Sequence, residues 1–328
     1  MARTGILLIN LGTPDAPDPK SVRRYLKEFL SDPRVIEKRG PLWWLVLNGI
    51  ILPRRSGRSS TAYRLIWDAK LNDSPLRIIT RSQAGKLSDS FAGEADIIVE
   101  WAMRYGNPSI KSAVARLEAA GCDRLLPFPL YPQYSAATTA TALDKVFDAL
   151  KTMRRQPSVR TVPPYFNDPA YIDAVAQSVR EHIASLAWMP DICLASFHGL
   201  PEAFIDAGDP YRDHCEVTTG LLRKALGMDA AAMPLVYQSR GGGRATWIGP
   251  SLEETLTTLA GKGVKNLCVV TPGFASDCIE TLEELRIRAA RTFLEHGGEN
   301  FTLVPCLNDS DLAVALLRDL TDRNLGGW

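Results

Sequence analysis

Residues 191–201 read DICLASFHGLP, a short apolar run that ends in a histidine and a Gly-Leu-Pro turn. A second stretch, residues 267–285, reads LCVVTPGFASDCIETLEEL, and its apolar run leads into acidic side chains. Runs this short and this apolar are typical of strands buried on both faces of a parallel sheet. Similar runs alternate with helical patterns over the rest of the chain, at Gly5–Leu11, Ile97–Ala102, Asp123–Leu130 and Met233–Tyr237. The alternation predicts a doubly wound α/β fold.

The two halves of the chain also resemble each other. Residues 107–135 align without a gap to residues 249–277, with Pro, Ser, Leu, Gly and Leu at matching positions. A second register aligns INLGTP at 9–14 with SFHGLP at 196–201. Such internal similarity predicts two similar Rossmann-like lobes, each a parallel sheet flanked by helices, around a central cleft.

The duplication also suggests how the chain divides. We expect an N-terminal lobe over 1–165, a C-terminal lobe over 166–308, and a C-terminal helix over 309–328 that packs back on the first lobe.

Composition excludes several classes of protein. The net charge of +1 gives no reason to expect a nucleic-acid partner. Six cysteines are scattered without a CxxC pair, so neither a structural zinc site nor an iron–sulfur cluster is expected. The N-terminal apolar run is too short for a signal peptide, which favours a cytoplasmic protein.

His198 is the histidine held at the end of a predicted strand. In open α/β sheets, ligands bind beyond the carboxyl ends of the strands. An imidazole with a pKa near neutrality suits a general base or a metal ligand there. The structural alternative is a histidine that only completes the strand end.

Acidic residues follow the second quoted strand. Asp277, Glu280 and Glu284 would fall on one face of an α-helix and could form a path for a cation or for protons. Asp277 and Glu280 also have the spacing of a helix N-cap and its capping-box partner. The sequence leaves both interpretations open.

Aromatic and basic residues end two strands of the first half. Arg104, Tyr105 and Tyr131 could stack on a flat ligand and hold its carboxylates, or they could be core packing. Leu11 stands opposite His198 in the internal alignment, so the first half offers apolar contact where the second offers titratable groups.

Residues 41–53, PLWWLVLNGIILP, form the most apolar segment of the chain. Spanning a bilayer needs about 20 apolar residues, so this segment is too short to cross one. It could dip into a membrane interface, with Arg54, Arg55 and Arg58 facing the headgroups. A buried loop or helix is the alternative.

Taken in order along nearly the whole chain, these motifs resemble those of the ferrochelatases, which insert ferrous iron into a porphyrin at the end of haem synthesis. The motifs are LINLGTP (8–14), EFLSDPRVI (28–36), MRYGNPS (103–109), LYPQYSAATT (130–139), SFHGLP (196–201), GDPY (208–211), YQSR (237–240) and PGFASDCIETLEEL (272–285). The match is most similar to the proteobacterial type that uses protoporphyrin.

The resemblance implies roles for individual residues. The catalytic histidine of the family falls on His198 as proton acceptor, and its active-site glutamate falls on Glu280 as a metal-side ligand. Asp277 and Glu284 continue the acidic ridge. Positions that contact the macrocycle or its propionates fall on Arg55, Tyr63, Ser74, Arg104, Tyr131 and Trp247.

The resemblance also implies the substrates and partners. Protoporphyrin IX and ferrous iron would be substrates, and no cofactor would be permanently bound. Leu11 replaces a tyrosine of some coproporphyrin-using relatives. The segment 41–53 falls on the lip through which porphyrin enters, which implies peripheral contact with the inner membrane surface. We expect a monomer or a weak dimer.

The chain departs from the family pattern near Trp247, because the stretch that begins at Arg240 is one residue longer than usual.

Two other functions compete with this interpretation. One is a cobalt or nickel chelatase that acts on a sirohydrochlorin-type ring, although such substrates carry more carboxylates and need a more basic pocket. The other is a two-lobed ligand-binding protein without catalysis. Replacing His198 by alanine separates these, because an enzyme would lose metal insertion and a binding protein would lose at most affinity.

Overall fold

A computed structural model describes residues 3–37, 40–241 and 245–328. The chain forms two compact units. Unit 1 comprises Met1–Leu130, Ala136–Pro163 and Asp309–Trp328, and unit 2 comprises Tyr131–Ser135 and Pro164–Asn308. The division therefore falls after residue 163 rather than after 165, and the short segment 131–135 belongs to unit 2 although it lies within the first half of the sequence.

Unit 1 contains a parallel sheet whose four strands, among the described residues, have the order β2-β1-β3-β4. The strands are β1 (Arg3–Thr13), β2 (Ile97–Gly106), β3 (Cys122–Pro129) and β4 (Ser158–Val159). Its helices are α1 (Pro19–Leu30), α2 (Pro41–Val46), η1 (Leu47–Ile51), α3 (Leu52–Ile66), α4 (Pro75–Ser90), α5 (Ile110–Ala119), η2 (Ala136–Ala140), α6 (Thr141–Leu150) and α12 (Asp311–Leu325). The η elements are π-helices.

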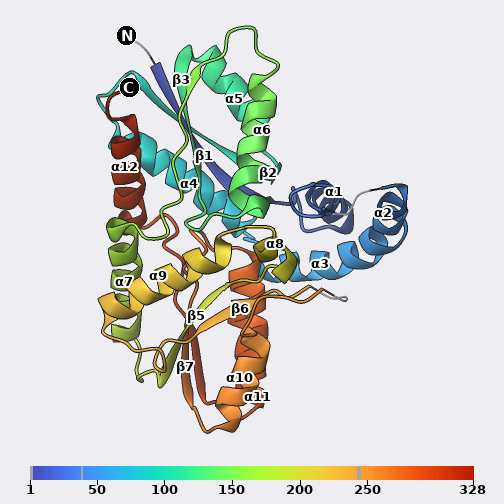
Figure 1. The fold of residues 1–328 in the computed structure, drawn as a ribbon, viewed down its shortest axis with the longest axis vertical. Helices are drawn as coiled ribbons and strands as arrows, with labels where there is room; N and C mark the ends of the chain where they lie inside the picture. Colours follow the sequence, from blue (N-terminus) through green and yellow to red (C-terminus); the bar gives the residue numbers. More distant parts are fainter. Residues whose placement is uncertain (1–2, 38–39, 242–244) are drawn as a thin grey trace. The chain divides into compact units, whose positions relative to one another are not determined.

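Unit 2 repeats this plan with a parallel sheet whose four strands, in the part of the chain described, have the order β6-β5-β7-β8. The strands are β5 (Ile192–His198), β6 (Leu235–Gln238), β7 (Asn266–Val270) and β8 (Asn300–Leu303). The helices are α7 (Pro169–Ala184), α8 (Glu202–Asp206), α9 (Tyr211–Leu226), α10 (Leu252–Gly261), the π-helix η3 (Glu280–Ala289) and α11 (Ala290–Glu295). Figure 1 shows η3 and α11 as one orange rod along the sheet.

The two sheets have the same topology. Equivalent hydrogen bonds also occur at aligned positions of the internal repeat. In unit 1 the Met103 amide donates to Pro108 O at 2.8 Å, and in unit 2 the Tyr237 amide donates to Pro250 O at 2.8 Å. Pro108 and Pro250 are the first aligned prolines of the internal repeat. The predicted fold class, two similar α/β lobes with parallel sheets, is confirmed.

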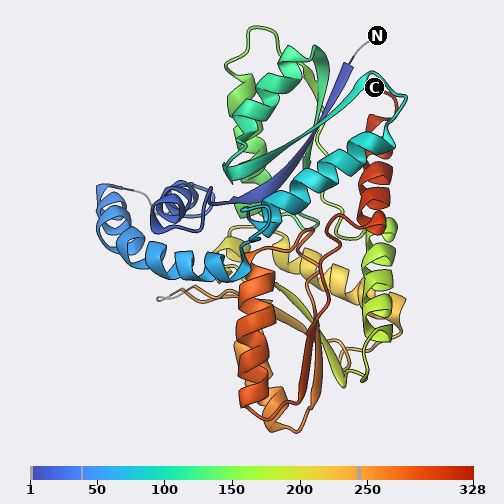
Figure 2. The ribbon, with the colours of Figure 1, turned by 180° about the vertical axis from the view of Figure 1, so that it is seen from behind.

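The helix α12 lies against α4 within unit 1, as Figure 2 shows for the red and cyan helices. Asp309, just before α12, accepts hydrogen bonds from Ser82 and forms an ion pair with Lys86 on α4. The C-terminal helix thus belongs to the first unit.

Residues 41–58, which we call the lip segment, form α2, η1 and the first half of α3. Leu47 and Leu52 are buried against Leu30, whereas Leu42 and Trp44 are 74% and 60% exposed. The segment is therefore an amphipathic surface element, not a wholly buried one. No helix in the described ranges is both long enough and apolar enough to cross a bilayer.

Candidate active site

Three neighbouring strands of unit 2 end at the same edge of the sheet, and polar side chains lie at or beyond the end of each of them. His198 is the last residue of β5, and it pairs in register with Gln238 at the end of β6. After β7 the chain turns through Pro272 and Gly273 to Asp277 and then to η3. Because parallel strands share their carboxyl end, this edge is where a ligand site is expected.

The imidazole of His198 has a defined orientation and tautomer. Its Nδ1 lies 2.7 Å from Gly199 O, and a carbonyl oxygen only accepts, so Nδ1 carries the proton. In the neutral ring the lone pair is then on Nε2. Gly199 cannot be replaced easily, because a Cβ there would lie 2.9 Å from Gln238 O. The half-buried His198 therefore offers Nε2 as a base or as a metal ligand.

The carboxylates lie on a π-helix, not on the α-helix that their spacing predicted. η3 spans ten residues, and its Leu285 is fully buried in the core of unit 2, which fixes the rotation of the helix. π-Helices are rare and frequently occur at functional sites. Glu280 and Glu284 both remain partly accessible on this element.

Glu284 is electrostatically linked to both catalytic candidates. Burial raises the pKa of Glu284, while hydrogen bonds from Ser239 and the charges of His198 and Arg288 lower it and Glu280 raises it, with a net upward shift. The charges of His198 and Glu280 therefore both act on this carboxyl group. Gln238 pairs in register with His198 and also bonds the main chain of Glu280, and the next residue, Ser239, bonds Glu284. These contacts bring the three proposed residues together within unit 2.

Two residues that the sequence interpretation missed hold the acids in place. The Ser239 amide and hydroxyl both donate to the Glu284 carboxylate, at 2.8 and 2.6 Å. Gln238 donates through Nε2 to Glu280 O at 3.2 Å and accepts from Ser196 at 2.7 Å. Ser239 has a φ of 61°, a left-handed conformation that serine rarely adopts. The motif YQSR marked these positions, but their partners lie more than 40 positions away in sequence.

Asp277 is not a helix cap, which corrects one of the two interpretations left open. The residue that precedes η3 is Ile279, and no side chain caps the helix. Asp277 instead accepts from Thr281 Oγ1 at 2.8 Å and from Asn308 Nδ2 at 2.7 Å. The predicted capping box with Glu280 is therefore absent from the described structure, and capping does not explain why Glu280 is acidic.

The described residues contain no group of three or more His, Cys, Asp or Glu side chains arranged to hold a metal ion. Cys278, next to the acids, is buried, and burial followed by the charge of Glu280 raises the pKa of its thiol. It is therefore a protonated thiol rather than a thiolate ligand. What remains at this edge is one imidazole and carboxylates, a set that can take up protons and bind a cation briefly.

Two predicted ring contacts also belong to unit 2. Trp247 pairs with Pro201 in an isolated bridge, and its ring packs over Gly199. Its buried indole Nε1 has no hydrogen-bond partner among the described residues, which leaves a donor beside the His198 turn. Tyr131 is partly buried at the start of the segment 131–135. Residues 242–244 of the lengthened stretch before Trp247 lie outside the described residues.

The remaining predicted contacts lie in unit 1. Leu11 is partly buried near the end of β1, and Arg55 is exposed on α3. Tyr63 is 5% exposed and packs edge-on against Tyr25. Ser74 is buried just before α4. Leu11 and Arg55 keep surface for a ligand, whereas Tyr63 and Ser74 are mainly packed inside the unit.

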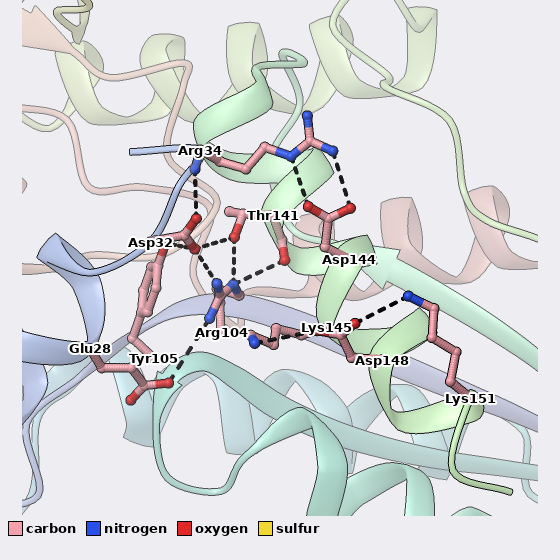
Figure 3. A network of polar contacts seen from close by, with 10 residues as sticks. All are labelled: Glu28, Asp32, Arg34, Arg104, Tyr105, Thr141, Asp144, Lys145, Asp148 and Lys151. Atoms are coloured by element: carbon pink, nitrogen blue, oxygen red, sulfur yellow. Dashed lines mark hydrogen bonds and ion pairs between the residues drawn. The ribbon is translucent and has the colours of Figure 1, made fainter. Parts of the chain in front are cut away.

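Arg104 and Tyr105 belong to a buried network, shown in Figure 3. The Arg104 guanidinium pairs with Asp32 and donates to Thr141 Oγ1 at 2.7 Å, and Tyr105 donates to Asp32 at 2.8 Å. Arg104 is 5% and Tyr105 0% exposed. Because an internal carboxylate bonds the guanidinium, these two residues have a structural role in unit 1, and their contact with a ligand stays a prediction.

Comparison with known proteins identifies the family. The family model described as Ferrochelatase matches residues 3–325. The ferrochelatase of Nitrobacter hamburgensis is 54% identical over 326 residues, covering 99% of this chain and 94% of the relative. The chain belongs to the ferrochelatase family. A further ferrochelatase, from Bradyrhizobium sp., is 53% identical over 327 residues, covering 100% of this chain and 93% of the relative. The predicted family and enzyme class, insertion of iron into protoporphyrin in haem synthesis, are confirmed.

Solved structures agree on the fold. SirB from Bacillus subtilis with Fe3+ matches with a TM-score of 0.57 at 10% identity, covering 99% of this chain and 96% of that one. The sirohydrochlorin chelatase SirB from the subspecies spizizenii, in complex with cobalt, matches with a TM-score of 0.55 at 10% identity, over 99% and 97% of the two chains. At such low identity these likenesses support the two-lobed chelatase fold alone.

Proposed function

We propose that the chain metalates protoporphyrin IX with ferrous iron by means of His198, Glu280 and Glu284. Iron is a substrate here, so it needs few and exchangeable ligands that it can leave for the ring nitrogens. One imidazole nitrogen and a carboxylate match that need better than a closed site of three or four ligands would. Asp277 extends the proposed path for protons or iron.

The proton balance assigns the roles. Metalation removes two N–H protons from the pyrrole nitrogens and joins four nitrogen lone pairs to Fe2+. In the proposal, Nε2 of His198 accepts a proton, and Glu280 and Glu284 pass protons on. A carboxyl group whose pKa is raised by burial, such as Glu284, exchanges protons more readily near neutral pH than an ordinary exposed glutamate.

The observation that carries the proposal is the tautomer of His198. A neutral imidazole with Nδ1–H bonded to Gly199 O has its lone pair on Nε2, the atom that a base or a metal ligand must present. Leu11, Arg55, Trp247 and Tyr131 are the proposed contacts of the macrocycle.

The test is His198→Ala assayed with protoporphyrin IX and ferrous iron, followed by absorbance. General-base catalysis contributes typically about 10²–10⁴-fold, so metal insertion should fall by that factor while porphyrin binding, read from fluorescence, persists. His296→Ala is the control, because this exposed histidine of the same unit contacts Thr292 O, one turn back, and is not among the proposed site residues. Unimpaired insertion by the His198 variant would refute the assignment. Parallel assays with cobalt and with a sirohydrochlorin-type ring test the rival chelatase function.

We also propose that the protein works in the cytoplasm and touches a membrane surface through the lip segment. Leu42, Trp44 and Leu45 are exposed on α2, and three exposed arginines follow on α3. Apolar anchors flanked by basic side chains are the pattern of interfacial helices on anionic lipid. Protoporphyrin is apolar, so such contact would bring the enzyme to its substrate. A monomer or weak dimer remains our expectation.

A further inference from the structure

The segment 131–135 belongs to unit 2, although the residues on both sides of it belong to unit 1. The chain leaves unit 1 after Leu130 and rejoins it at Ala136, and the five residues between belong to unit 2. The segment begins with Tyr131, a proposed contact of the macrocycle. What holds these five residues to unit 2 therefore bears on the proposed site.

One helix of unit 2, α9, supplies two anchors of this segment. His214 and Thr218, one turn apart on α9, bond to the segment, since the Tyr134 amide donates to His214 Nδ1 at 3.1 Å and Gln133 Nε2 donates to Thr218 Oγ1 at 3.0 Å. Just before α9, Asp209 accepts from Ser135 Oγ at 2.9 Å. Two of these bonds come from side chains, whereas His214 is bonded by the main chain of the segment.

His214 is held so that its Nδ1 can only accept a hydrogen bond. Its ring stacks on Phe166 with centroids 3.6 Å apart and an interplanar angle of 8°, which fixes the plane of the imidazole. A backbone amide can only donate, so Nδ1 must be unprotonated and the proton of the neutral ring lies on Nε2. A charged imidazole would present N–H to N–H and would break this contact.

The anchored segment lies next to the strand that carries His198. A Cβ built on Gly273 would lie 3.2 Å from Phe197 Cδ1 and 3.5 Å from Gln133 Oε1. Phe197 directly precedes His198, and Gly273 is in the turn that leads to the acids. Gln133 is 2% exposed and closely packed, so a shift of the segment would also displace its neighbours at this edge of the sheet.

We infer that His214 is a positioning residue for metal insertion: as a neutral acceptor it holds residues 131–135, and with them Tyr131, in the place where the macrocycle is bound. This inference rests on the proposed function, because Tyr131 matters only if the chain binds a porphyrin. His214 itself touches neither substrate nor iron in this scheme.

The inference predicts a dependence on pH. Burial lowers the pKa of His214, and the nearby carboxylates Asp213 and Asp209 raise it, with a net shift below the ordinary value of 6.5. The anchor is therefore intact at neutral pH and is lost as the pH falls through that lowered pKa. Below this point the affinity for porphyrin should fall further in the wild type than in a variant whose residue 214 cannot titrate.

Two variants separate the acceptor from the ring. His214→Asn places an amide oxygen where Nδ1 was, so it keeps an acceptor for the Tyr134 amide but cannot titrate. His214→Phe keeps an aromatic ring over Phe166 but has no acceptor. We expect the Phe variant to show a KM for protoporphyrin IX about tenfold higher, the change that one lost hydrogen bond accounts for, with the KM for iron unchanged. The Asn variant should match the wild type at neutral pH, and its KM for protoporphyrin IX should rise less in acid than that of the wild type, because residue 214 no longer titrates.

Amide hydrogen exchange gives a readout that does not need activity. The peptide that covers residues 131–135 should exchange faster in the Phe variant at all pH values, after correction for intrinsic rates, and in the wild type only at acidic pH. The peptide over Cys122–Pro129 is the internal control and should not change. Equal exchange and equal KM in the Phe variant, or a defect of the Asn variant equal to that of the Phe variant, would overturn the inference. If the wild type inserts no iron, the proposed function fails, whereas the exchange measurement still decides whether His214 holds the segment.

Discussion

Replacing Asp32 by alanine should destabilise unit 1 strongly, because Asp32 is the carboxylate of the buried network in Figure 3. Its side chain is 1% exposed, and that of its partner Arg104 is 4% exposed. Tyr105 and Thr141 also donate to the same carboxylate. The substitution removes the acceptor from these three side chains and from the Arg34 amide, and it leaves a charged guanidinium in the interior.

The magnitude follows from the buried charge. Removing one partner of a buried ion pair costs about 3–5 kcal/mol of stability. The lost hydrogen bonds of the Tyr105 and Thr141 hydroxyls add less than their separate values, because neighbouring groups at one site are not additive. We expect the free energy of unfolding to fall by about 4 kcal/mol. The variant Asp32→Ala/Arg104→Met removes both charges and should recover part of that loss.

The assay is urea unfolding followed by tryptophan fluorescence. Five tryptophans lie in unit 1, at positions 43, 44, 67, 101 and 328, so the signal reports mainly on this unit. The control is Asp144→Ala. Asp144 Oδ2 lies 2.8 Å from Arg34 Nε, an equally direct ion pair, but the Asp144 and Arg34 side chains are 44% and 41% exposed. An exposed pair contributes at most about 1 kcal/mol. A loss in Asp32→Ala no larger than that of the control would refute the reasoning.

A pH series gives a second check on Asp32. Burial raises its pKa, but hydrogen bonds from Thr141, the Arg34 amide and Tyr105, and the charge of Arg104, lower it below the ordinary value of 3.8. A carboxyl group with a lowered pKa stabilises the folded state above 3.8, and this contribution disappears as the pH falls through the lowered pKa. The difference in stability between wild type and Asp32→Ala should therefore shrink only in strong acid. A difference that vanished already at pH 6 would contradict this account.

The other predictions concern the site and the lip segment. Glu280→Gln should lower turnover at least tenfold and leave porphyrin affinity, measured by fluorescence titration, nearly unchanged; unchanged turnover would remove Glu280 from the mechanism. Ser239→Gly and Ser239→Ala both lose the hydroxyl bond to Glu284, but glycine relieves the positive φ, so urea unfolding should find the Gly variant more stable by about 1 kcal/mol. Neutralising the three exposed arginines of the lip segment should weaken sedimentation with anionic vesicles, whereas equal sedimentation would argue against membrane contact through this segment.

Sequence alone was sufficient for the parallel sheets, the duplication and the family. The central strands carry continuous apolar runs, since both faces of a parallel strand are covered, and this pattern is local. The edge strands β4 and β8 were missed because they are short and only partly buried, so their residues need not be apolar. His198 and Glu280 could be proposed from sequence because their strand ends and motifs are contiguous in the chain.

Only the tertiary structure decided what each polar side chain bonds to. Arg104 looked suited to a ligand carboxylate until its partner proved to be Asp32, 72 positions away. Asp277 had the spacing of a helix cap, but the following helix is a π-helix, and Asn308 and Thr281 take up its carboxylate. His214 lies in none of the motifs that the sequence offered, and only folding placed the Tyr134 amide against its Nδ1. Apolar periodicity is a local property of the chain, whereas the partner of a hydrogen bond depends on which distant segments the fold brings together.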